Sequence, residues 1–183
     1  MTNRIHELLN FWFKEHGPSD WYAQNDEFDN LIRSKFLGLH ELATSGGLTS
    51  WRSSPEGQLA EIIILDQFSR NLFRGRAEAF AWDELALSLA KQAVGEGADQ
   101  KLSKQMRAFF YLPYMHSETL EDHNEAMKLF KALGQEENLK FEMLHRDIIQ
   151  RFGRYPYRNG VLGRTSTPEE KAFLADPSEP FKG

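Results

Sequence analysis

The apolar residues of this chain recur at every third or fourth position along most of its length, and this spacing constrains the fold more than any other feature. Leu59, Ile62, Ile63 and Phe73 are one example of the pattern. Spacing of this kind places the apolar side chains on one side of a helix, whereas a half-buried strand requires strict alternation. No segment alternates over several residues, so the sequence predicts an all-α fold.

Local start and stop signals divide the chain into about eight helices. Ser54 precedes a proline at a first helical position, and Thr167 to Glu170 forms a capping box around Pro168. Gly134 and Gly153 follow apolar stripes and are typical helix stops. Pro113 is expected to kink or end its helix. The expected helices cover roughly residues 5–13, 28–42, 55–73, 82–95, 103–114, 120–133, 138–152 and 167–174.

The connections between these segments are mostly short, so sequential helices are expected to pack as antiparallel neighbours. No linker rich in proline or serine divides the chain. The expected organisation is therefore a single all-helical domain over residues 1–183, with an irregular tail from about residue 175.

The composition excludes several classes of function. The net charge of −5 argues against a general binder of nucleic acid or of anionic membranes, and no stretch approaches the ~18 apolar residues of a membrane helix. The absence of cysteine excludes disulfides, thiolate metal sites and a cysteine nucleophile, and it fits a cytoplasmic protein. The usual glycine-rich nucleotide motifs and the serine hydrolase motif are missing. No cofactor is predicted, and the oligomeric state stays open.

A cluster of arginines close to the C-terminus is the main candidate for a site. Five of the twelve arginines lie between Arg146 and Arg164, with no lysine among them, and they extend from a predicted helix end into a glycine-rich loop. Guanidinium groups favour planar, two-point recognition of carboxylate or phosphate. The start of the helix after Thr167 also offers free N–H groups to an anion. The alternative is that these arginines pair with carboxylates of neighbouring helices and hold the C-terminal segment in place.

Two further observations add ionisable residues to this candidate site. Asp66 and Arg70 lie four residues apart within an apolar stripe, and an unpaired buried charge costs several kcal/mol, so both are expected to be paired, with each other or with other groups. They form either a structural ion pair or a pair in which Asp66 orients Arg70 towards a polar cavity. His145 lies on the apolar face of the 138–152 helix, as a core residue or as an acid–base group.

A second cluster contains residue types that bind divalent metals: His116, Glu118, Asp122 and His123. Its spacing fits no recognised metal motif, and the two carboxylates also suit the first turn of a helix. No metal site is predicted.

Several motifs occur together in order: FWF at 11–13, LDQFSRNLFRG at 65–75, AFAWDELAL at 79–87, the segment 106–117, and HRDIIQRFGRYPYRNGVLGRTSTPEE at 145–170. With them the chain resembles the bacterial family known as domain of unknown function 924, over essentially its whole length. The resemblance implies a fold similar to the tetratricopeptide-like helical superfamily and no assigned activity. Ser69 stands where the family usually has proline, and Tyr157 where it often has histidine; the second departure disfavours acid–base catalysis centred on that loop.

Three functions follow from these observations. The favoured one is a binding or scaffold module with an arginine-lined pocket for an anionic small molecule or an acidic peptide segment. The second is an enzyme that acts on an anionic substrate with His145 as the acid–base group, and the third is a charged set with a purely structural role. The predicted site comprises Asp66, Arg70, Arg107, His145, Arg154, Arg158, Asn159 and Arg164.

Overall fold

The computed structural model describes residues 2–181, and within them every regular element is a helix. The prediction of an all-α fold is therefore confirmed, and eight of the α-helices have eight or more residues. The α-helices are α1 (Thr2–Asn10), α2 (Pro18–Trp21), α3 (Asp26–Thr44), α4 (Pro55–Ile63), α5 (Ser69–Leu72), α6 (Asp83–Gly95), α7 (Lys104–Met115), α8 (Leu120–Leu133), α9 (Glu136–Phe152) and α10 (Pro168–Ala175).

The capping residues form the local structures that their sequence predicts. The side chain of Ser54 accepts a hydrogen bond from the N–H of Gly57 at the start of α4. Thr167 and Glu170 make both bonds of the capping box that opens α10. Gly134 and Gly153 end α8 and α9 with φ of 72° and 67°, the left-handed conformation that glycine adopts without strain.

Three predicted helices differ from expectation in detail. The helix expected over 5–13 ends as α1 at Asn10 and continues as a π-helical turn at Phe11–Glu15. The segment expected as one helix over 55–73 contains a π-helical turn at Ile64–Phe68, which separates α4 from α5. Pro113 does not end α7, because the helix continues to Met115 and the N–H of His116 still donates to the carbonyl of Leu112 at 2.9 Å. A proline this close to the C-terminus removes one backbone bond without preventing the last turn.

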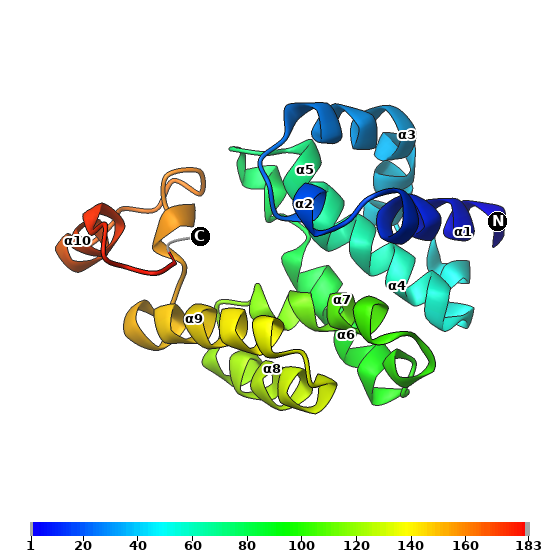
Figure 1. The fold of residues 1–183 in the computed structure, drawn as a ribbon. Coiled ribbons are helices and arrows are strands. Elements are labelled where there is room, and N and C mark those ends of the chain that lie inside the picture. Colours follow the sequence, from blue (N-terminus) through cyan, green and yellow to red (C-terminus); the bar gives the residue numbers. More distant parts are fainter. Residues whose placement is uncertain (1, 182–183) are drawn as a thin grey trace.

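The helices form layers around α4 and the π turn. On one side α1 contacts α4, while α3 contacts α5 and the π turn; on the other side α6 and α7 pack against α4 (Figure 1). Because Ile62, Ile63, Ile64 and Leu65 are all fully buried, this central segment is apolar on every side except where its charged residues lie. The central layer thus places Asp66 and Arg70 close to the middle of the molecule.

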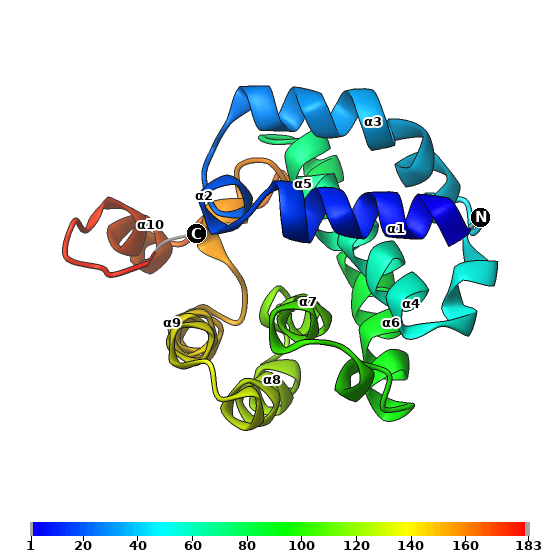
Figure 2. The same cartoon turned by 45° about the vertical axis from the view of Figure 1, so that its right-hand side comes forward.

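Beyond this core the chain continues as α7, α8 and α9, each packed on the one before it (Figure 2). The C-terminal segment attaches to α9 through a second, smaller apolar cluster of Ile148, Ile149, Tyr155 and Phe173. In Figure 2 α10 lies at the edge of the molecule beyond α9. Within residues 2–181, none of the helices combines the length and apolarity that crossing a membrane requires.

Candidate functional site

The π turn carries Asp66 into the interior, where its side chain is only 1% exposed. The expected pair with Arg70 is confirmed: Nη1 of Arg70 lies 3.2 Å from Oδ1 of Asp66 and donates to the Asp66 carbonyl at 2.7 Å. Gln67 donates to the other carboxylate oxygen at 2.5 Å. Single π turns occur frequently at functional sites; this one lies within the central helix, and a second follows α1 at Phe11–Glu15.

His116 is the third partner of the buried carboxylate. It follows α7, and its Nδ1 lies 2.7 Å from Oδ1 of Asp66. A carboxylate only accepts hydrogen bonds, so Nδ1 carries the proton of this contact. The contact joins two residues that are 50 positions apart in the chain.

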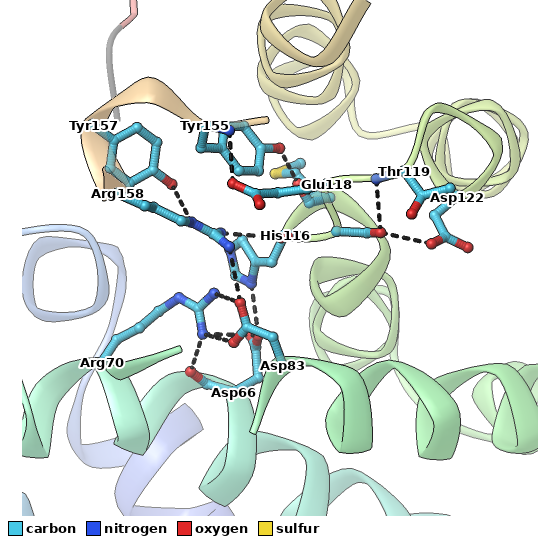
Figure 3. A network of polar contacts seen from close by, with 12 residues as sticks. Asp66, Arg70, Asp83, His116, Glu118, Thr119, Asp122, Tyr155, Tyr157 and Arg158 are labelled. Atoms are coloured by element: carbon cyan, nitrogen blue, oxygen red, sulfur yellow. Dashed lines mark hydrogen bonds and ion pairs between the residues drawn. The ribbon is translucent and has the colours of Figure 1, made fainter. Parts of the chain in front are cut away.

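Asp83, the first residue of α6, joins two arginines from distant segments. Arg70 donates to both of its carboxylate oxygens, at 2.9 and 3.0 Å. Arg158 donates to Oδ2 of the same carboxylate at 3.2 Å and to the carbonyl of His116 at 3.0 Å. Figure 3 shows both guanidinium groups directed at the carboxylate of Asp83, with the imidazole of His116 next to them.

Aromatic rings hold Arg158 in this position. Its guanidinium carbon lies 4.6 Å from the ring centres of both Phe80 and Tyr155. Its Nε also donates to the hydroxyl of Tyr157 at 3.4 Å. Cation–π contacts stabilise a guanidinium that has lost most of its water, and the Arg158 side chain is only 5% exposed. We refer to the connected residues as the central polar cluster: Asp66, Arg70, Asp83, His116, Tyr157 and Arg158.

The cluster has a definite charge state. Burial acts to raise the pKa of Asp66, but His116 and Arg70 together outweigh it and hold the pKa well below its usual range. Burial acts to lower the pKa of Arg70, and the carboxylates of Asp83 and Asp66 more than compensate, so it is raised. Burial and the nearby Arg70 lower the pKa of His116, so this imidazole is neutral at neutral pH. Two carboxylates therefore balance two guanidinium groups around a neutral histidine.

Two other predicted residues meet outside this cluster. Arg154 makes a two-point contact with Glu170 of α10, at 2.6 and 2.9 Å, and Asn159 donates to the same carboxylate at 3.1 Å. The hydrogen bond from Arg154 is the main reason that the pKa of Glu170 is lowered, to about 2. The loop and α10 are thereby joined to each other.

Arg164 joins the same loop to the helices. It donates to both oxygens of Glu118, at 2.6 and 3.0 Å, in the connection between α7 and α8. Glu118 also accepts from the backbone N–H of Tyr155 at 2.7 Å. The pairs made by Arg154 and Arg164 correspond to the structural alternative, in which arginines hold the C-terminal segment in place.

Within residues 2–181, His145 and Arg107 make no hydrogen bond, ion pair or ring contact to the members of the central polar cluster. The Nδ1 of His145 bonds to the carbonyl of Phe141 at 2.7 Å, and its ring packs on Tyr155 and Phe181. Burial lowers the pKa of His145 to about 3. Arg107 donates to the carbonyl of Asp99 at 3.2 Å.

Of the predicted set, the structure thus brings Asp66, Arg70 and Arg158 together in one cluster. It adds Asp83, His116 and Tyr157, which the predicted set did not include. An acid in the first turn of a helix is common for reasons of the helix dipole alone, so Asp83 stood out in the sequence only as part of the family motif AFAWDELAL at 79–87. His116 was visible as a member of the group with metal-binding residue types and as part of the family motif segment 106–117.

That group does not converge in the structure. His116 bonds to Asp66, Glu118 to Arg164, Asp122 to Ser117 at 2.6 Å, and His123 to Glu142 at 2.8 Å. Among the described residues, no three His, Asp or Glu side chains come together as ligands of one metal ion.

The start of α10 does not offer the anion site that its capping sequence suggested. The N–H of Thr167 and the N–H of Glu170 already donate within the capping box, at 2.8 and 3.2 Å. A surface hollow lies here, but Glu169 and Glu170 belong to its lining and repel an anion. The central polar cluster is therefore the stronger candidate.

These observations define a class of protein: it is all-helical and contains a buried cluster of paired charges. The chain belongs to the family described as bacterial protein of unknown function (DUF924), whose family model matches residues 8–178. It is similar to a solved structure described as a protein of unknown function, ATU0120, from Agrobacterium tumefaciens. The two chains are 40% identical, with a TM-score of 0.91 over 95% of this chain and 98% of that one. No curated protein matches the chain.

Proposed function

We propose that this chain is a helical binding protein that holds the carboxylate or phosphate of a small molecule, or of an acidic peptide segment, between Arg70 and Arg158. One observation carries the proposal: the two guanidinium groups come from distant parts of the chain and converge on a single carboxylate. Planar donors in this arrangement match the geometry of carboxylate and phosphate oxygens.

Asp83 occupies the position where the ligand would bind. Its side chain is 15% exposed and lies at the start of α6, so rotation towards solvent would expose the two guanidinium groups. With Asp83 turned away, Arg70 and Arg158 outnumber the one remaining carboxylate, Asp66, and the region carries a net positive charge. An incoming anion would restore the balance and would also face the N-terminus of a 13-residue helix.

The packing of α6 to α9 in sequence supports a tetratricopeptide-like helical array, the arrangement that we infer for the chain. Arrays of this kind bind peptides and small ligands on their concave surfaces. A fold does not define a function, so the charged cluster is the basis of the proposal and the array supports it only as context.

Titration of Asp83→Ala and wild-type protein with inorganic phosphate and with citrate tests the proposal. Removal of the internal carboxylate is expected to tighten binding about tenfold, equivalent to ~1.4 kcal/mol. Binding is measured by calorimetry and by a thermal shift, because a ligand at 100 times its dissociation constant stabilises the folded state by ~2.7 kcal/mol.

Arg158→Lys is the matched variant, since it keeps the charge and loses the planar two-point contact. It is expected to lower the affinity of the Asp83→Ala protein for either anion. Arg151→Ala removes an arginine at the surface, 40% exposed, and is expected to leave binding unchanged. If Asp83→Ala binds neither anion, or if Arg158→Lys has no effect on the binding, the cluster is a structural ion-pair network instead.

A further inference from the structure

His116 has one nitrogen engaged and one free. Nδ1 donates to Asp66, whereas Nε2 has no hydrogen-bond partner anywhere in residues 2–181. The contact with Asp66 therefore selects the Nδ1–H tautomer and leaves the lone pair of Nε2 available. The imidazole side chain is 15% exposed, so it is not sealed off from solvent.

Two buried histidines that pack against Tyr155, His123 and His145, lack this arrangement. His123 uses both nitrogens, one towards Glu142 at 2.8 Å and one towards the carbonyl of Ser117 at 2.9 Å. His145 is oriented by the carbonyl of Phe141, which is uncharged and stabilises an imidazolium less than a carboxylate does. Only His116 of these three combines a carboxylate partner with a free nitrogen.

The two guanidinium groups are close neighbours of this imidazole. Arg70 shares Oδ1 of Asp66 with His116, at 3.2 Å, and Arg158 donates to the His116 carbonyl at 3.0 Å (Figure 3). An anion held by the two arginines would therefore lie beside His116, and any negative charge that develops on it would be stabilised by them.

We propose that His116 is the proton acceptor of an acid–base site, acting on an anionic substrate that Arg70 and Arg158 hold. This inference rests on the proposed anion site and adds a reaction to it. The lone pair of Nε2 takes a proton from an O–H or C–H group of the substrate, and the bonding electron pair stays on the substrate beside the guanidinium groups. The resulting imidazolium is stabilised by Asp66, a positioning residue, and the proton returns to the product or to water.

The first test determines the tautomer of His116 by long-range ¹H–¹⁵N NMR of the histidine rings in the full chain. His116 is expected as the Nδ1–H form at neutral pH in wild-type protein. In Asp66→Asn the carboxylate that selects this tautomer is lost, so the His116 ring is expected no longer to be held in the Nδ1–H form. If wild-type His116 is the Nε2–H form or an imidazolium, Nε2 holds a proton and the proposal fails.

The second test measures how fast Nε2 of His116 reacts with diethylpyrocarbonate, and mass spectrometry detects the modified residue. The nitrogen attacks a carbonyl carbon and an ethoxycarbonyl group is transferred. The ring loses a proton, and the released ethyl carbonate takes up a proton as it decomposes to ethanol and carbon dioxide. His116 is expected to react at least tenfold faster than His123 and to slow about tenfold in Asp66→Asn. Exposed His6 is the internal control and is expected to react equally in both proteins.

Modification in the presence of inorganic phosphate distinguishes the acid–base role of His116 from the anion site of Arg70 and Arg158 on which it rests. Phosphate is expected to slow modification of His116 and to leave that of His6 unchanged. If phosphate binds but does not protect His116, the acid–base role fails and the binding site stands. If phosphate binds to neither wild-type protein nor Asp83→Ala, the proposed anion site fails first. If His116 reacts no faster than His123, its free nitrogen is not available and the acid–base role is contradicted directly.

Discussion

Glu118 lies in the connection between α7 and α8 and accepts hydrogen bonds from two parts of the loop that follows α9. Arg164 contributes two of these bonds and the backbone N–H of Tyr155 contributes another. The pKa of Glu118 is lowered, because the hydrogen bond from Arg164 and its other partners outweigh the effect of burial. A single side chain thus anchors the C-terminal segment to the helices before it.

Glu118→Ala is expected to destabilise the protein by ~1–3 kcal/mol, because it leaves a buried backbone N–H and a guanidinium without their acceptor. The measurement is the free energy of unfolding in urea. The control is Glu125→Ala, which removes an exposed pair with Lys128 and is expected to change stability by less than ~0.5 kcal/mol. Equal effects of the two substitutions would show that the contacts of Glu118 do not stabilise the fold.

At the scale of single residues, the sequence predicted that the charged side chains are paired, but it did not predict most of their partners. The pair of Asp66 with Arg70 was predictable because i, i+4 spacing within an apolar stripe forces two charges together. Asp83 and His116 come from other helices, at separations of 13 and 50 residues, and no local pattern encodes such contacts. Arg154 and Arg164 were predicted as a group with Arg158, yet each has its own carboxylate.

At the scale of the helix, the two glycines inside long apolar stripes differ in what surrounds them. Gly38 lies within α3, and a Cβ added there would meet no atom within 4 Å. Gly57 lies in the first turn of α4, and a Cβ there would lie 2.0 Å from the carbonyl oxygen of Trp51. Because the obstacle is backbone, the short helical turn before α4 would have to move.

Gly38→Ala is therefore expected to stabilise the protein by ~0.5–1 kcal/mol, since alanine loses less backbone entropy in a helix. Gly57→Ala is expected to destabilise it by ~1–3 kcal/mol, because the strain exceeds that gain. The midpoints of urea unfolding measure both. Stabilisation by Gly57→Ala would mean that the approach of Trp51 to α4 is not as close as described.

Helix boundaries were predictable because their signals are local: a capping side chain, a proline at the first position, a glycine with positive φ. The π turn at Ile64–Phe68 was not, because its backbone register depends on contacts with α3 and α6, which are remote in sequence. The feature that brings Asp66 to the centre of the candidate site was thus hidden in an otherwise ordinary helical pattern.

At the scale of the whole molecule, three buried or partly buried histidines respond to pH in the same direction. Burial lowers the pKa of His145 to about 3, and it also lowers the pKa values of His40 and His116. These residues lie in α9, in α3 and after α7, so they come from three separate parts of the fold. Their arrangement in space depends on how helices pack, which the apolar stripes alone do not specify.

Stability is consequently expected to fall as the pH drops below the ordinary histidine value of 6.5. Between that value and about 3, the unfolded chain binds a proton at His145 that the folded chain does not. The unfolded state therefore gains the advantage on acidification, by at most ~1.4 kcal/mol per pH unit for each such histidine. Carboxylates with lowered pKa values, such as Glu170, add to the loss only below their ordinary value of 4.5.

Urea unfolding of wild-type protein and His145→Gln between about pH 7.5 and pH 5 isolates one of these contributions. Glutamine keeps a side-chain N–H for the Phe141 carbonyl and cannot take up a proton. The slope of stability against pH is expected to be smaller in His145→Gln, by up to ~1.4 kcal/mol per pH unit. His6→Gln, at an exposed position, is expected to keep the wild-type slope. If His145→Gln also keeps that slope, His145 is protonated in the folded protein, and its burial against Tyr155 and Phe181 does not exclude the charge.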